Sequence, residues 1–161
     1  MHRQLSLALA VPIFASFVAP CLANDLNSSE RLDADTSITN STNTIREQIE
    51  AKEFELAINA AEKQIRNVER GGSRYDLGLI EPLVLLGDAL TEFGDYEGAL
   101  KAYDRAIHVT RVNRGLHDPT QVNIVYREAA TMFANGQLNR ANDRQEYAYS
   151  VLLRNFNVLD P

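Results

Sequence analysis

Apolar residues recur at helical spacing along most of the chain. In residues 53–70, five of them fall on one face of a helix (Phe54, Ala57, Ile58, Ala61 and Ile65), and Gly71-Gly72-Ser73 ends the pattern. A helix is expected before this one, starting at Thr44, where Thr44 and Glu47 form a capping box. Further helices are expected near Pro82, then from Tyr96 with Asp95 as its cap, from Asp118-Pro119 and from Leu138. Glycines 94, 115 and 136 end three of these segments, and the last ends near Phe156. No stretch alternates apolar and polar residues long enough for a strand, so we predict an all-α fold of six helices in three antiparallel hairpins.

The predicted hairpins repeat every 42 residues. The segment 94–100 aligns with 52–58 and with 136–142, so that a large apolar residue and a small residue three positions later recur in register (Phe54 and Ala57, Tyr96 and Ala99, Leu138 and Ala141). Asp118-Pro119 recurs as Asp160-Pro161. A fixed period of this length is typical of a solenoid, in which stacked hairpins bury a continuous core.

The middle repeat resembles the tetratricopeptide repeat (TPR), with a large residue, a Leu-Gly pair and a turn followed by small and aromatic residues. The residues that carry the resemblance and are expected to pack the repeat are Leu83, Leu86, Gly87, Leu90, Ala99, Tyr103 and Ala106. The spacing and Gly115-Leu116-His117-Asp118-Pro119 resemble the 42-residue variant found in kinesin light chains and in many bacterial TPR proteins. Glu128 and Gln145 depart from the pattern, at positions where Leu and an aromatic residue are usual. Over residues 44–161 the resemblance implies a right-handed superhelix of about three hairpins.

The resemblance also implies a concave groove lined by the first helix of each hairpin. In the middle repeat this face carries Glu81, Val84, Asp88, Thr91 and Glu92, and in the third repeat it carries Asn123, Tyr126, Ala130, Phe133 and Ala134. An acidic patch is therefore expected beside an aromatic one. Aromatic residues supply much of the binding energy of protein interfaces, which favours a partner-binding surface. An ordinary solvated face is the alternative.

The first 23 residues are typical of a cleaved secretory signal. Arg3 precedes an apolar run over residues 5–18, and small residues at 21 and 23 suit cleavage after Ala23. The run is too short to span a bilayer, and Pro12 interrupts it. Lipidation of Cys21 is a less favoured alternative because Pro20 precedes it. Residues 24–43 are polar and acidic, and we expect a disordered linker between the signal and the repeat domain of residues 44–161. A periplasmic or secreted location follows from the signal.

Composition argues against several other classes of function. After removal of residues 1–23, 15 Lys and Arg face 22 Asp and Glu, and no basic cluster suits nucleic acid. The single cysteine, Cys21, belongs to the signal, so the mature chain has no thiol for catalysis or metal binding. His108 and His117 lack the spacing of metal ligands, and Gly71-Gly72 is followed by no phosphate-loop lysine. We expect no enzyme activity, no cofactor, no metal and no membrane span after signal cleavage.

The sequence thus predicts an exported TPR scaffold that binds a protein or peptide whose identity it leaves open. The alternative is a structural spacer, or the N-terminal repeat segment of a larger periplasmic assembly. The chain more faintly resembles periplasmic TPR proteins of Gram-negative bacteria, some of which continue into a TonB-like energy-transducing domain. The last helix carries more apolar residues than one buried face needs, so either self-association through this helix or a continuation of the chain is expected.

Overall fold

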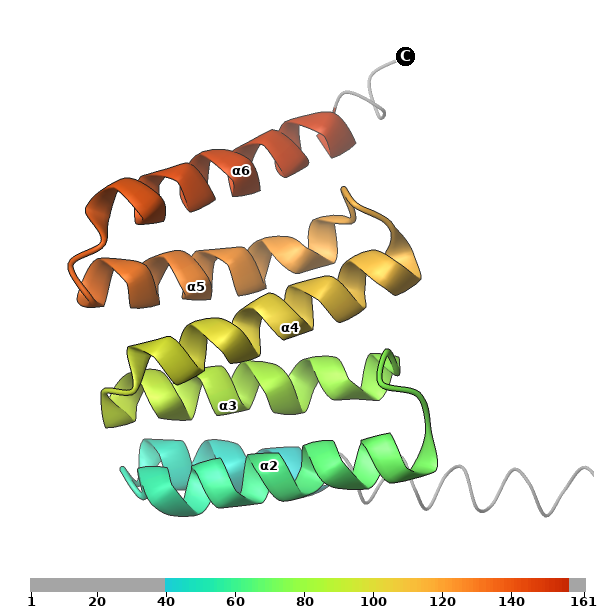
Figure 1. The fold of residues 1–161 in the computed structure, drawn as a ribbon, viewed down its shortest axis with the longest axis vertical. Coiled ribbons are helices and arrows are strands. Elements are labelled where there is room, and N and C mark those ends of the chain that lie inside the picture. The colour runs from blue at the N-terminus through green and yellow to red at the C-terminus, as the bar shows by residue number, and fades with distance from the viewer. Residues whose placement is uncertain (1–39, 157–161) are drawn as a thin grey trace, which may run out of the picture. The chain divides into compact units, whose positions relative to one another are not determined.

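The computed structural model describes residues 40–156. The predicted signal segment, the linker up to residue 39 and Asp160-Pro161 lie outside the described residues. Within 40–156 the chain is all-α, and no strand is present. Residues 40–50 are helical, followed by α2 (Phe54–Gly71), α3 (Ile80–Phe93), α4 (Tyr96–Arg114), α5 (Val122–Ala134) and α6 (Leu138–Phe156). Each helix packs against its neighbours in the chain, as Figure 1 shows, so the predicted all-α fold of six helices is confirmed.

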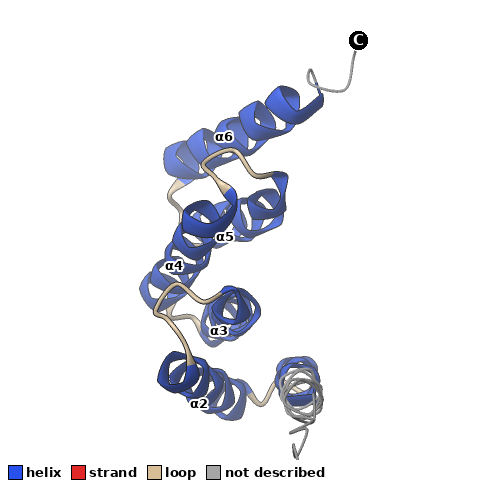
Figure 2. Ribbon diagram, turned by 90° about the vertical axis from the view of Figure 1, so that its right-hand side faces the viewer, coloured by secondary structure: helices blue, strands red, loops and turns tan. Residues whose placement is uncertain are grey.

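The six helices form two layers. We call helix 40–50, α3 and α5 the first-helix layer, and α2, α4 and α6 the second-helix layer (Figure 2). Side-chain contacts join members of one layer across the repeats. Thr91 on α3 shares a 2.9 Å hydrogen bond with Thr131 on α5, and Arg105 on α4 forms an ion pair with Glu69 on α2. Contacts between equivalent helices are what a stack of hairpins requires.

Asp and Gly residues set the ends of the helices. Asp95 accepts a hydrogen bond from the Gly98 backbone amide at the start of α4, and Gly94 adopts the left-handed conformation (φ 94°) that closes α3. Asp76 and Asp118, 42 residues apart, cap two short 3₁₀ turns, Leu77–Leu79 and Pro119–Gln121. The helix expected to open at Asp118-Pro119 therefore begins with a 3₁₀ turn, and α5 proper starts at Val122.

The expected capping box at Thr44 is wrong. Residues 40–43 are already helical, and the Thr44 hydroxyl donates a 3.0 Å hydrogen bond to the Asn40 carbonyl one turn earlier. A threonine inside a helix commonly bonds in this way to the residue four positions before it. The polar residues 40–43 therefore belong to the first described helix.

The core is continuous through the stack. One cluster joins Leu83 and Tyr103 of the middle hairpin to Val125 and Val151 of the last, and all four are buried. A second cluster, around Ile45, Ala57 and Ala61, fills the first hairpin and meets α3 at Leu85 and Ala89. Leu86 packs against both clusters, so the middle hairpin links the core of the first to that of the last.

Candidate functional site

Two adjoining clefts run along the first-helix layer, and together we call them the groove. The first has a volume of about 450 Å³ and lies between the end of helix 40–50, α3 and α5. The second, of about 370 Å³, lies beside it towards the other end of the same helices. Both are lined by Ile49, Glu50, Asp88 and Arg127. Helical periodicity brings these residues together because positions three and four apart on each helix lie on one face.

Most of the predicted groove residues do line it. Asp88, Thr91, Glu92 and Ala130 face the first cleft, and Glu81, Val84, Asp88 and Asn123 face the second. Tyr126 and Phe133 are exposed on α5, at 41% and 66%, but line neither cleft. Ala134 is exposed and is likewise absent from both linings. The structure therefore does not place the two aromatic residues among those that line the clefts.

Asp88 is the centre of a polar cluster at the boundary of the two clefts. The Tyr103 hydroxyl donates a 2.8 Å hydrogen bond to Asp88 Oδ1, and Arg127 Nη1 lies 2.6 Å from Oδ2. The Asp88 side chain is only 19% exposed. Burial, together with the Asp88 charge, raises the pKa of the Tyr103 hydroxyl well above its usual range, so this hydroxyl stays a donor. The cluster therefore fixes α4 and α5 to α3.

The expected acidic patch is for this reason largely neutralised. Arg127 neutralises Asp88, and Arg46 on the first described helix forms an ion pair with Glu81. Both arginines were missed by the sequence analysis, although Arg127 lies four residues after Asn123 and so on the same helical face. No ion pair joins Glu50 or Glu92 to another of the residues 40–156. These two carboxylates, with Lys52, are the charges that the groove leaves available.

The residues expected to pack the middle repeat lie in its interior. Leu83, Gly87, Ala99, Tyr103 and Ala106 are buried. Leu86 and Leu90 are half-buried and pack against the core. Tyr103 thus belongs to the packing of α3 against α4 through its ring and to the groove through its hydroxyl. Substitutions at this residue would change both.

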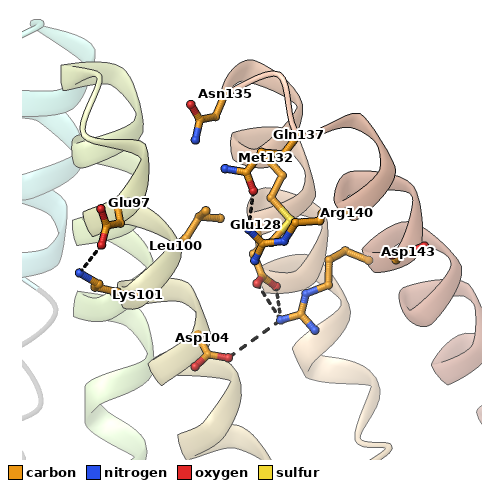
Figure 3. A pocket seen from close by; sticks show the side chains of 11 residues that line it. Glu97, Leu100, Lys101, Asp104, Glu128, Met132, Asn135, Gln137, Arg140 and Asp143 are labelled. Carbon is orange, nitrogen blue, oxygen red and sulfur yellow. Dashed lines mark hydrogen bonds and ion pairs between the residues drawn. The ribbon is translucent and has the colours of Figure 1, made fainter.

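A third cleft, of about 690 Å³, opens on the other side of α5, between α4 and α6 (Figure 3). Glu128 lies at its base, 3% exposed, and Arg144 Nη2 is 2.6 Å from each of its carboxylate oxygens. Burial raises the pKa of Glu128, and the ion pair with Arg144 opposes this shift. Glu128, which departs from the TPR pattern, thus has a partner on the facing helix.

The two described histidines lie in different surroundings. His108 packs edge-on against Tyr75, with ring centroids 5.6 Å apart, and His117 Nε2 is 2.8 Å from Arg154 Nη1. Within residues 40–156, no three His, Cys, Asp or Glu side chains come together as a metal site would require. None of the helices in this part of the chain combines the length and apolar character needed to cross a membrane.

Comparison of the chain with protein-family models finds no match, and comparison with curated proteins finds none either. The function is therefore inferred from the groove and the residues that line it.

Proposed function

We propose that the chain is a TPR-like scaffold that binds a segment of another protein in the groove. The observation that carries this proposal is the pair of adjoining clefts along helix 40–50, α3 and α5, which share Asp88 and Arg127. A peptide lying across the first-helix layer can occupy both clefts at once. Recognition of this kind buries apolar anchors in pockets and uses polar groups for specificity.

The lining of the groove indicates the chemistry of the segment. Phe54, Val84 and Ile124 offer apolar walls for aliphatic or aromatic side chains. Glu50 and Glu92 have no ion-pair partner among residues 40–156, and they outnumber Lys52 in the same cleft. A segment that places basic side chains beside apolar ones fits this lining. Electrostatic complementarity of this sort mainly raises the association rate and the specificity.

Export of the scaffold is part of the proposal and rests on the sequence. A basic residue, an apolar run and small residues before position 24 support a cleaved signal, and hence a periplasmic or secreted protein. Mass spectrometry of the exported protein should find Asn24 at its N-terminus. A retained Met1, or a lipid on Cys21, would contradict this part of the proposal.

The binding proposal can be tested with peptides selected from a random library on the purified chain. Their affinity should fall at least tenfold for Glu92→Lys and for Asn123→Arg, which change the two clefts separately. Glu62→Lys is the matched control, because Glu62 lies on α2, outside both linings. Peptides that bind the three variants and the unchanged chain equally well would place binding outside the groove.

A structural spacer is the second candidate, and one observation favours it. The ion pairs Arg46–Glu81 and Arg127–Asp88 use charges of the groove to join helices of the first-helix layer to each other. A spacer in a larger assembly, including a TonB-like energy-transducing one, needs such rigidity and no ligand. A library that yields no peptide sensitive to Glu92→Lys or Asn123→Arg would favour the spacer.

A further inference from the structure

Exposed apolar side chains are concentrated on the last hairpin. Eleven large apolar side chains are exposed within residues 40–156, and six of them belong to α5 and α6 (Tyr126, Phe133, Leu138, Tyr149, Leu153 and Phe156). In α2, by contrast, Leu56 alone is of this kind. Concentrated apolar exposure of this sort marks an interaction site more often than scattered single residues do.

The 42-residue period relates this exposed surface to a contact surface inside the stack. The residues that lie 42 positions before the exposed ones form the contacts between the middle hairpin and the last one. Ile107 is fully buried in the core that also contains Val122 and Val125, and its counterpart Tyr149 is 59% exposed. Arg111 Nε donates a 2.9 Å hydrogen bond to Gln121, and its counterpart Leu153 is 42% exposed.

The same relationship holds for the first-helix layer. Thr91 bonds to Thr131 across the repeat boundary, whereas its counterpart Phe133 is 66% exposed. Val84 is 9% exposed, and its counterpart Tyr126 is 41% exposed. We call Tyr126, Phe133, Tyr149, Leu153 and Phe156 the terminal edge. The terminal edge of the last hairpin corresponds to the surface of the middle hairpin that packs against the hairpin after it.

We propose that the terminal edge binds the terminal edge of a second copy of this chain, forming a dimer with two-fold symmetry. Tyr149, Leu153 and Phe156 follow one another at spacings of four and three residues, which forms an apolar seam along one side of α6. When two such seams pair antiparallel about Leu153, Tyr149 of one copy meets Phe156 of the other. The seam is therefore self-complementary, as an interface with two-fold symmetry requires.

Charge favours this arrangement over a head-to-tail one. Between Tyr149 and Phe156 the sole charged residue is Arg154, and its guanidinium contacts His117 of the same chain. Each copy of the seam thus brings only this one charge to the contact, although the chain as a whole carries a net charge of −6. The α2 helix at the opposite edge carries Glu55, Glu62, Lys63, Arg66, Glu69 and Arg70. Among the described residues of α2, Leu56 is the one large apolar side chain that is exposed, so this helix has no apolar seam to match that of α6.

Sedimentation of the chain over the micromolar range tests the dimer. We expect a concentration-dependent equilibrium between monomer and dimer. The double variant Tyr149→Glu/Leu153→Glu should remain a monomer at every concentration while keeping its helical circular dichroism spectrum. Leu56→Glu/Val112→Glu is the matched control, with two exposed apolar residues on α2 and α4, and it should dimerise like the unchanged chain.

A disulfide experiment tests the symmetry of the contact. In a Cys21→Ser background, Leu153→Cys should give a disulfide-linked dimer on mild oxidation, because residue 153 lies near the two-fold axis. Leu56→Cys should stay monomeric under the same conditions. A monomer at all concentrations, a dimer insensitive to the Tyr149/Leu153 variant, or species larger than a dimer would overturn the proposal. None of these outcomes bears on binding in the groove, which uses other residues.

Discussion

The ring of Tyr103 lies directly against the backbone of Gly87. A Cβ atom on residue 87 would be 2.5 Å from Tyr103 Cε1 and 2.6 Å from Cζ, far inside van der Waals contact. The ring is 1% exposed, and its hydroxyl is held by Asp88, so it has no free direction in which to move. The absence of a side chain at residue 87 therefore allows α3 and α4 to approach and places the Tyr103 hydroxyl in the groove.

Gly87→Ala should lower the free energy of unfolding by about 1–3 kcal/mol, the usual cost of overpacking a core. In an open helical position the same change would stabilise the protein by up to about 1 kcal/mol. Gly71→Ala supplies that control, because Gly71 is helical and a Cβ there meets nothing within 4 Å. Urea denaturation measures both. A Gly87→Ala variant as stable as Gly71→Ala would show that the Tyr103 ring can move aside at little cost in free energy.

The buried pair Glu128–Arg144 should behave as a unit. Arg144→Ala should cost about 3 kcal/mol, because it leaves a buried carboxylate without its partner. The middle hairpin has Leu86 and Ala102 at the corresponding positions, 42 residues earlier. Glu128→Leu combined with Arg144→Ala should therefore recover most of the stability. Urea midpoints of the two single variants and the double variant test this. Strictly additive losses would contradict it.

Glu128 should also make stability depend on pH. Burial raises the pKa of this carboxyl above the ordinary 4.5, so the folded chain binds its proton more tightly than the unfolded chain does. The stabilising contribution is then fully present below pH 4.5 and is lost as the pH rises through the folded pKa. The unfolding free energy of the unchanged chain, relative to Glu128→Gln, should increase on acidification through this window. A difference between the two free energies that stays constant or falls on acidification would contradict this prediction.

Asp88 should contribute to stability far more than its neighbour Glu92. Asp88→Ala leaves the Tyr103 hydroxyl and Arg127 without their acceptor and should cost about 1–3 kcal/mol. Glu92→Ala, one turn later on the same helix, removes an exposed side chain that forms no ion pair with the described part of the chain, so it should change stability by less than about 0.5 kcal/mol. Thermal denaturation at neutral pH distinguishes the two. Equal effects would mean that Asp88 is a surface charge rather than a structural acceptor.

Most helix boundaries could be predicted because local chemistry sets them. Asp95 and Gly115 bound α4 at the residues expected from the sequence, since a capping carboxylate and a glycine act within one turn. For residues 40–43, local chemistry predicted the wrong structure, since these residues were expected in the linker and are helical. Asn, Ser and Thr there give no apolar periodicity, and a threonine that bonds back into its helix looks like one that caps it.

The faces of the groove could be predicted, but its charge balance could not. Helical spacing places Asp88 and Glu92 on one side of α3, whereas the partners of Glu81 and Asp88 are 35 and 39 residues away in the chain. Only the folded stack brings Arg46 and Arg127 to them. The sequence pattern also does not reveal that two corresponding pairs of packed residues have their large and small members interchanged. Gly87 with Tyr103, and Ile45 with Ala61, occupy corresponding positions with large and small residues reversed.

Position-resolved photocrosslinking in the cells that make the protein shows whether a partner binds in the groove. A photoreactive amino acid is placed at Asn123 or Glu92 in the groove, and at Val112 or Leu56 as exposed controls outside it. We expect that Asn123 and Glu92 both crosslink to the same polypeptide, through a segment that combines basic and apolar residues, and that Val112 and Leu56 do not. Crosslinks to that polypeptide from the control positions alone, or from all four equally, would contradict binding in the groove.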